Sequence, residues 1–175
     1  MRNVEIKARV HDRTKIVNLA QKLVGEEPAE LLQHDIFYNS PNGRLKMRSF
    51  TVNGVKKSEL IWYNRPDQSG PKLSEYNKTE LDEATLESLK ISLALSMGIK
   101  GEVKKSRTLF IYEQTRIHID TVEGLGDFME LEVVLNENQT VEDGDKTAKH
   151  IQKLLEVSDE DLLTVAYMDM LNARK

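Results

Sequence analysis

Strict alternation of polar, mostly charged residues with apolar residues is the feature that most constrains how this chain can fold. Residues 3–10, 44–48 and 116–120 alternate without a fault, and residues 130–133 continue the pattern after a glycine-rich turn. A period of two places all polar side chains of a strand on one face of a sheet and all apolar ones on the other. These segments therefore predict strands with one charged face and one apolar face.

Further segments complete a predicted α+β fold. Residues 60–65 and 104–112 are typical of strands with less cleanly sorted faces, and residues 64–71 indicate a long hairpin turn. Six or more strands joined mostly by turns favour an antiparallel sheet that curls or closes, with helices packed on its apolar surface. Apolar spacing and capping residues predict four helices: from Asp12 to about Gly25, from Asp82 to Gly98, from about Asp145 to Leu155, and from Ser158 through Leu171.

Composition limits the class of protein. The chain has 175 residues, so one domain spanning residues 1–175 is expected. A formal net charge of −4 lacks the strongly basic field of a non-specific nucleic-acid binder. No apolar run approaches the roughly 20 residues that span a bilayer, and the charged N-terminus has no signal-peptide pattern. We therefore expect a cytoplasmic monomer or homodimer without a nucleic-acid or membrane partner. The absence of cysteine excludes disulfides, thiolate metal sites and cysteine nucleophiles.

The predicted polar faces hold fixed charges sorted by sign. Lys46 lies two positions from Arg48, and Glu130 lies two positions from Glu132, so each like-charged pair points one way, roughly 7 Å apart along its strand. Paired carboxylates without a histidine or cysteine neighbour suit a hard cation such as Mg²⁺ or Mn²⁺. Clustered lysine and arginine suit a phosphate chain. The pattern therefore predicts a polyanion site with a divalent metal.

A solvated sheet face is the competing interpretation of the same pattern. Antiparallel sheets commonly turn one charged face to water, where ion pairs contribute little to stability. Recurrence of like-charged neighbours on several strands weighs against it, because such neighbours are mildly unfavourable unless a ligand or metal neutralises them. The pattern alone leaves both interpretations open. His118 is interpreted as a structural histidine, and His34 as a polar residue at a strand edge.

Several segments resemble, in order along the chain, the motifs of one protein family. Residues 120–132 are very similar to its specific D-x-V-x-G-L-G-x-F-x-E-x-E signature. Residues 3–7 resemble its N-terminal ExExK strand, residues 45–48 its LRxR-type strand, residues 63–66 and 74–76 its next basic and acidic strands, and residues 167–171 its C-terminal segment. On these motifs the chain is identified as a member of the CYTH superfamily of triphosphate tunnel metalloenzymes.

The resemblance implies an eight-stranded antiparallel β-barrel, with helices packed outside, that holds a triphosphate in an open tunnel. It implies that Glu5, Glu130 and Glu132 are catalytic. Asn3 departs from the pattern, since it stands at the first glutamate of ExExK, and the lost charge predicts weaker binding of a second metal. The implied ligands of Mg²⁺ or Mn²⁺ are Glu5, Glu75, Glu130, Glu132 and Asp120. The implied triphosphate-binding residues are Lys7, Arg9, Lys46, Arg48, Arg65, Lys105, Arg107 and Arg116.

The resemblance leaves the role of Asp120 and the reaction open. Asp120 is alternatively a structural partner of Arg9 or the residue that orients Arg116. The predicted reaction is metal-dependent hydrolysis of a triphosphate, with inorganic tripolyphosphate as the substrate because no residues that would contact a base or a thiamine ring are evident. The family also contains class IV adenylyl cyclases and thiamine triphosphatases, so these reactions are the alternatives. A non-enzymatic polyphosphate- or nucleotide-binding module is a third interpretation.

Overall fold

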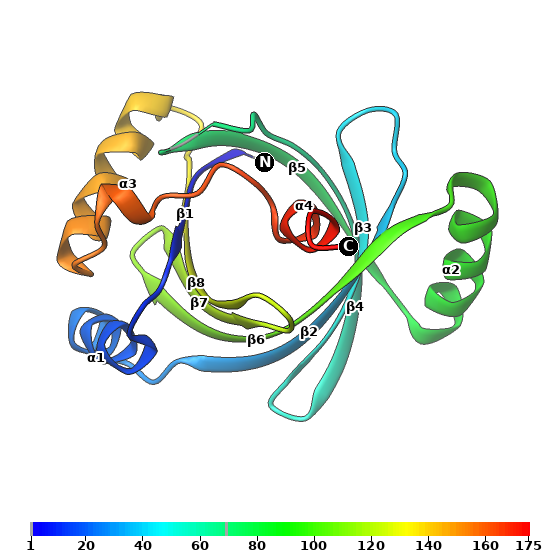
Figure 1. Ribbon diagram of the computed structural model, residues 1–175, viewed down its shortest axis with the longest axis horizontal. Helices are drawn as coiled ribbons and strands as arrows, with labels where there is room; N and C mark the ends of the chain where they lie inside the picture. Colours follow the sequence, from blue (N-terminus) through cyan, green and yellow to red (C-terminus); the bar gives the residue numbers. More distant parts are fainter. Residues whose placement is uncertain (1, 69) are drawn as a thin grey trace.

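Eight antiparallel strands close into a barrel in the computed structural model, which describes residues 2–68 and 70–175 (Figure 1). Around the barrel the order is β1, β5, β4, β3, β2, β6, β7 and β8, and β8 pairs back with β1. The antiparallel eight-stranded barrel is therefore confirmed. The strands are β1 (Arg2–Arg9), β2 (Ala29–Tyr38), β3 (Arg44–Val52), β4 (Val55–Asn64), β5 (Lys72–Leu81), β6 (Ile99–Tyr112), β7 (Thr115–Val122) and β8 (Gly126–Val134).

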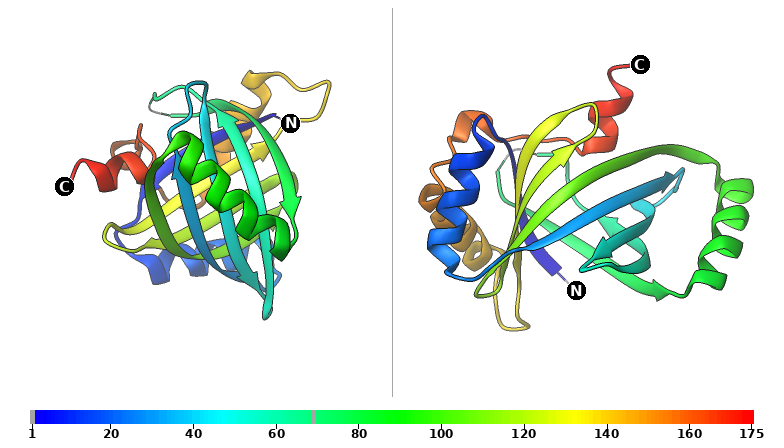
Figure 2. Two further views of the ribbon diagram at one scale, coloured as in Figure 1. Left: turned by 90° about the vertical axis from the view of Figure 1, so that its right-hand side faces the viewer. Right: turned by 90° about the horizontal axis from the view of Figure 1, so that it is seen from below.

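Helices cover parts of the outer barrel wall and one of its ends. Helices α1 and α3 lie on one side of the barrel, α2 lies at the opposite side, and α4 crosses an end of it (Figures 1 and 2). Among the described residues, none of these helices has the length and apolar character needed to cross a bilayer. The helices are α1 (Arg13–Val24), α2 (Glu83–Met97), α3 (Val141–Leu154) and α4 (Tyr167–Asn172).

The main core lies outside the barrel, between its wall and helices α1 and α3. The apolar residues of the alternating strands point outward, and Val4 and Ile117 are fully buried there. Ile16 of α1 and Ile151 of α3 pack into the same cluster. The outward direction of the apolar face leaves the charged face of every such strand directed into the barrel.

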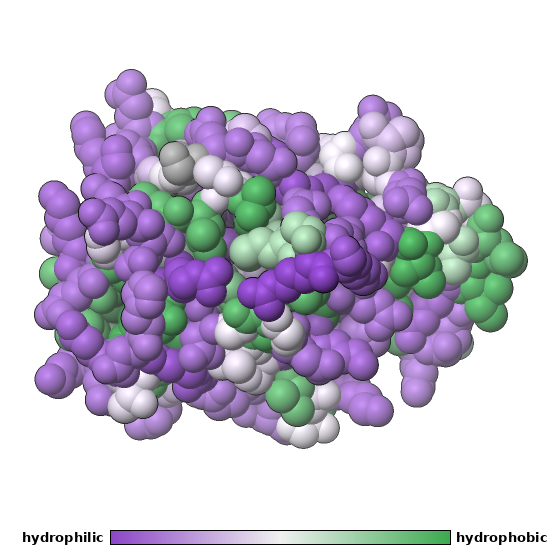
Figure 3. Space-filling view, viewed as in Figure 1, coloured by the Kyte–Doolittle hydropathy of each residue, from purple (hydrophilic) through white to green (hydrophobic). Residues whose placement is uncertain are grey.

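The first two helices begin and end as the sequence predicts. The side chain of Asp12 accepts a hydrogen bond from the backbone of Lys15, and α1 ends at Gly25, whose left-handed backbone suits glycine. The side chain of Asp82 caps α2 in the same way. Leu86 of α2 packs against the outer face of β2 and β3. Apolar side chains also gather on the exposed side of α2 (Figure 3).

The two C-terminal helix predictions need correction. Helix α3 begins at Val141, because Thr140 and Asp143 form a reciprocal capping box upstream of the predicted start. Ser158 caps only a short 3₁₀ turn, Asp159–Asp161. The chain then runs extended beside β1, where Leu162 bridges to Ala8, before α4 starts. Pairing with β1 therefore replaces the predicted continuous helix.

Candidate functional site

The barrel surrounds a cavity of about 280 Å³, and nearly half of the residues that line it are charged. Ten of the thirteen site residues predicted from the sequence line this cavity; nine come from five different strands, and Arg65 directly follows β4. The shared lumen excludes the solvated outer face as the location of these charges. The ten are Glu5, Lys7, Lys46, Arg48, Arg65, Lys105, Arg107, Arg116, Glu130 and Glu132.

The carboxylates of Glu130 and Glu132 lie together on the β7–β8–β1 side of the cavity. Glu130 Oε1 lies 3.0 Å from Lys7 Nζ, and Glu132 Oε2 accepts a 2.8 Å hydrogen bond from Arg116 Nε. Burial alone would raise the pKa of Glu130, but Lys7, His118 and Arg107 together hold that pKa well below its usual range. Burial also opposes the ionisation of Glu132, yet His118 and Arg116 lower its pKa to about 2. Both groups are therefore ionised at neutral pH.

Glu5 completes a group of three carboxylates on this side. It lies directly opposite Glu132 in the β1–β8 ladder, and its Oε2 accepts a 2.9 Å hydrogen bond from Arg65. Burial and the neighbouring charge of Glu132 raise its pKa. A bound cation would relieve the repulsion between these acids.

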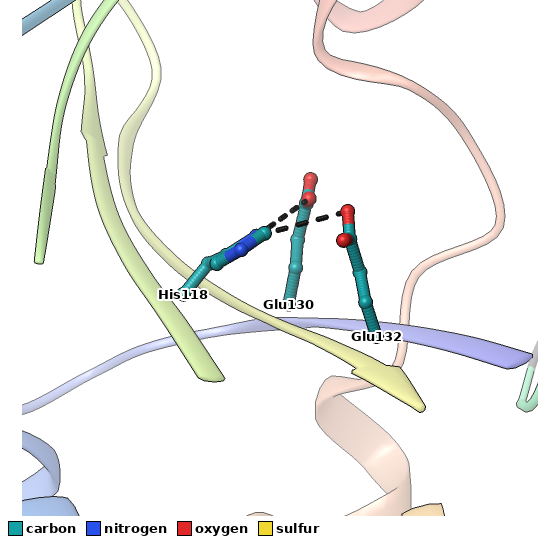
Figure 4. Close-up of side chains that lie close together, drawn as sticks. All are labelled: His118, Glu130 and Glu132. Atoms are coloured by element: carbon teal, nitrogen blue, oxygen red, sulfur yellow. Dashed lines mark ion pairs between the residues drawn. The ribbon is translucent and has the colours of Figure 1, made fainter. Parts of the chain in front are cut away.

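The donors present on this side fit a divalent cation. The ligand atoms of His118, Glu130 and Glu132 all lie within 4.8 Å of one another (Figure 4). Among the described residues, Asn3 Oδ1 and His118 Nδ1 are buried without a hydrogen-bond partner. Carboxylate and amide oxygens are ligands that Mg²⁺ and Mn²⁺ accept. These residues could therefore hold the metal that the resemblance implies.

Cations dominate the opposite side, around β2, β3 and β6. Asp35 accepts hydrogen bonds of 2.7 Å from both Arg48 Nε and Arg48 Nη2, and one of 3.1 Å from Lys46. Burial lowers the pKa of Lys46 to about 8 and that of Lys105 to about 7, with repulsion from a neighbouring arginine in each case. Two buried aspartates, Asp35 and Asp120, do not neutralise these three side chains together with Arg107. Such a wall suits a multiply charged anion.

Three predicted residues do not line the cavity. Glu75 is exposed on the outer face, because its neighbours Ser74 and Tyr76 occupy the inward positions of β5. This placement removes it from the metal ligands. Arg9 shares the inward face of β1 but lies beyond the cavity, with its guanidinium 5.0 Å from the ring of Phe128.

Asp120 is fully buried on the inward face of β7 but does not line the cavity, and other side chains engage both of its oxygens. Its two oxygens accept hydrogen bonds of 2.6 Å from Arg107 Nε and Nη2. Tyr167 donates a third bond, of 2.9 Å, to Asp120 Oδ2. Of the alternatives considered for Asp120, a structural ion pair is the one observed, but its partner is Arg107 and not Arg9 or Arg116.

Sequence reasoning missed several residues of the site. No alternation marks Asp35 in the sequence, because the outward positions of β2 include polar His34. Tyr167 closes one end of the cavity, where the Lys7 ammonium lies 3.7 Å from its ring centroid. Lys72 is fully buried, and its ammonium donates to the carbonyls of Leu163 and Thr164, which fixes the segment that leads to Tyr167.

Apolar side chains also reach the lining, which the sequence did not indicate. Leu31, Phe50 and Leu109 lie on β2, β3 and β6 and contribute to the same cavity. Phe50 faces Gln33 in the β2–β3 ladder, whereas Asp35 faces Arg48. Leu109 faces His118 in the β6–β7 ladder. The cavity therefore has an apolar part beside its charged part.

Comparison with known proteins gives consistent matches over nearly the whole chain. The family model described as CYTH domain matches residues 1–167. A protein of Methanocaldococcus jannaschii named "Putative adenylate cyclase" is 25% identical over 180 residues, covering 97% of this chain and 98% of that protein.

Solved structures share the fold at lower sequence identity. A Pyrococcus horikoshii protein superposes with a TM-score of 0.82 at 19% identity, covering 99% of both chains. A Vibrio parahaemolyticus protein, titled a putative adenylate cyclase, superposes with a TM-score of 0.75 at 16% identity, covering 97% of both chains. At this identity the superpositions support the barrel fold alone.

Proposed function

The chain belongs to the CYTH domain family, and from that premise we propose that it hydrolyses the terminal phosphate of a triphosphate compound with a divalent metal. The observation that carries the proposal is the cavity inside the barrel, in which three carboxylates group on the β1 and β8 side and a surplus of buried cations lies around β2, β3 and β6. A metal held by the carboxylates and a phosphate chain held by the cations would neutralise both sides at once. Inorganic tripolyphosphate is the proposed substrate, and Mg²⁺ or Mn²⁺ the proposed metal.

The cationic wall would bind and orient the phosphate chain. Arg107 is held by Asp120 in two hydrogen bonds, so its guanidinium needs little reorganisation to meet an anion. Arg48 is held in the same way by Asp35. Fixed arginines of this kind stabilise the charge that spreads over phosphoryl oxygens during transfer.

The carboxylate side would hold the metal and accept a proton. Glu130 and Glu132, both ionised, would be metal ligands; a bound divalent cation polarises phosphoryl oxygens and offsets their charge. Glu5 has a raised pKa and is the carboxylate best suited to take the proton from an attacking water. Attack of that water on the terminal phosphorus breaks its bond to the bridging oxygen, which releases phosphate and pyrophosphate from tripolyphosphate.

Cyclisation of ATP is the second candidate function. The matched proteins of Methanocaldococcus jannaschii and Vibrio parahaemolyticus are each called a "putative adenylate cyclase". Leu31, Phe50 and Leu109 supply apolar surface in the cavity that a nucleobase could contact, which weakens the sequence-based reason for preferring bare tripolyphosphate. In this reaction the 3′-hydroxyl attacks the α-phosphorus and pyrophosphate leaves.

A product assay separates the candidates. The protein is incubated with tripolyphosphate, thiamine triphosphate or ATP in the presence of Mg²⁺ or Mn²⁺, and phosphate, pyrophosphate and cyclic AMP are measured. Phosphate and pyrophosphate from tripolyphosphate support the proposed function. Cyclic AMP from ATP supports the second candidate, and tight binding without any product supports a binding module.

A further inference from the structure

One buried histidine faces the carboxylate pair from the neighbouring strand. His118 Nδ1 lies 3.8 Å from Glu130 Oε2 and 3.8 Å from Glu132 Oε1, and the three side chains point toward one another (Figure 4). The β7–β8 ladder fixes this arrangement, because His118 lies directly opposite Glu130, and Glu132 is the next inward residue of β8. The sequence had suggested a carboxylate pair without a histidine neighbour.

The imidazole Nδ1 makes no hydrogen bond to another described residue. His118 is only 4% exposed, yet its Nδ1 has no hydrogen-bond partner there. A separation of 3.8 Å from each carboxylate is too long for a hydrogen bond. Metal–ligand bonds of about 2.0–2.2 Å place two ligands of one cation roughly 3–4 Å apart. The observed spacing therefore suits a cation between the three groups.

We propose that His118 Nδ1 is a third ligand of the metal site, with Glu130 and Glu132, and that the site prefers a first-row transition-metal ion over Mg²⁺. This inference rests on the metal site of the proposed function but adds a nitrogen ligand and a metal class to it. Imidazole suits transition metals, whereas Mg²⁺ strongly prefers oxygen ligands. A mixed nitrogen and carboxylate set therefore favours Co²⁺ and Zn²⁺ most, and it favours Mn²⁺ over Mg²⁺ to a smaller degree.

The cations beside the two carboxylates leave room for such a metal. Glu130 contacts Lys7 and Arg107, at 3.0 and 3.4 Å, and Glu132 contacts Arg116. Each ionised carboxylate offers about four lone-pair directions, so these contacts do not exhaust its capacity. The ion pairs can hold the carboxylates in place while their remaining lone pairs face His118.

Metal titration with a nitrogen-sensitive spectroscopic readout tests the proposal. Binding of Mn²⁺ and Mg²⁺ is measured by calorimetry for the wild type, for His118→Asn and for the control His34→Asn, which changes a surface histidine paired with Glu102. We expect His118→Asn to weaken Mn²⁺ binding at least about tenfold and Mg²⁺ binding less than about twofold. Equal losses for both metals, or no loss for either, would overturn the proposal.

Electron spin echo measurements on the Mn²⁺ complex provide the direct evidence. Modulation from a coordinated ¹⁴N should be present in the wild type and in a variant in which the other three histidines, His11, His34 and His150, are changed to asparagine. This triple variant leaves the barrel interior intact, so the test stands even if His118→Asn does not fold. Absence of nitrogen modulation in the triple variant would refute the assignment.

Metal ligation and turnover can fail separately. Nitrogen modulation together with no product from any triphosphate would leave the ligand assignment standing and remove the proposed function. Turnover of tripolyphosphate with unchanged Mn²⁺ binding in His118→Asn would support the proposed function and remove the ligand assignment.

Discussion

Buried acids of two kinds occupy the barrel, and they differ in how neighbouring cations satisfy their charges. Asp35 and Asp120 are each engaged by both nitrogens of an arginine fork, from Arg48 and Arg107 respectively. No arginine fork engages the three glutamates of the opposite wall: each of their partners contributes a single nitrogen, and the glutamates lie beside one another as well. The aspartates are thus satisfied by the protein, whereas the glutamates keep free capacity for a cation.

The pKa values follow the same division. Burial opposes the ionisation of Asp35, but Arg48 and Lys46 hold its pKa well below the usual range. Burial and Glu132 together raise the pKa of Glu5, and Arg65 offsets only part of that effect. An aspartate that binds both nitrogens of an arginine therefore holds that arginine in place. A glutamate that lies beside another glutamate keeps a repulsion that a bound cation would relieve.

Removing a glutamate from the carboxylate wall should have the largest effect on activity. We expect Glu132→Gln to reduce turnover of the preferred triphosphate on the order of 100- to 1,000-fold, because the change removes a charge from the proposed metal site. The thermal unfolding midpoint should change little, since Glu132 contacts a partly exposed arginine. Steady-state kinetics and circular dichroism melting measure the two effects.

Glu75→Gln is the matched control, because Glu75 is an exposed acid on the outside of the barrel. It should retain wild-type turnover and melting. Wild-type turnover in Glu132→Gln, or equal losses in both variants, would contradict the division between inner and outer acids.

Removing an aspartate from the cationic wall should affect stability more than chemistry. Asp120→Asn leaves the buried Arg107 without its charged partner, and breaking such a pair costs about 3–5 kcal/mol of unfolding free energy. Turnover should fall only about tenfold in the protein that remains folded, since Arg107 loses orientation but stays in the cavity. Urea unfolding measures the loss of stability, and kinetics at low temperature measure the turnover of the folded protein. A turnover loss as large as that of Glu132→Gln, with unchanged stability, would mean that Asp120 acts on the substrate or metal directly.

The smallest expected effect is a pH dependence carried by Lys105. Burial, followed by repulsion from Arg107, lowers its pKa from 10.5 to about 7 in the folded protein. Metal-free binding of tripolyphosphate should therefore weaken several-fold as the pH rises from 6 to 8 and this ammonium loses its proton. Calorimetric titrations at several pH values measure the change, and Lys46, with a pKa of about 8, contributes at the upper end.

The stability of the free protein should change in the opposite direction. Between about pH 7 and 10.5 the unfolded chain holds more protons at Lys105 than the folded chain does, so unfolding free energy should rise with pH. Lys105→Met should flatten both profiles, whereas Lys78→Met, which changes an exposed lysine at the cavity rim, should leave their shapes unchanged. A wild-type profile in Lys105→Met would assign the titration to another group.

Much of the fold could be predicted because its signals are local. The alternation in β1, β3, β7 and β8 is a property of consecutive residues, and it identified which side chains share a face. Capping by Asp12 and Asp82 likewise acts within one turn. The C-terminal segment could not be predicted in the same way. Between Asp161 and Tyr167 the chain pairs with β1 instead of forming a helix, and this contact joins residues that lie far apart in the sequence.

The candidate site shows the same limit. The sequence by itself determined that Glu130, Glu132 and His118 lie on polar faces of their strands, because side-chain direction follows from a period of two. Only the tertiary structure decided that His118 lies opposite Glu130, that Arg107 binds both oxygens of Asp120, and that Glu75 faces outward. Those outcomes depend on strand register and barrel closure, which join residues far apart in the chain through hydrogen bonds that no local pattern encodes.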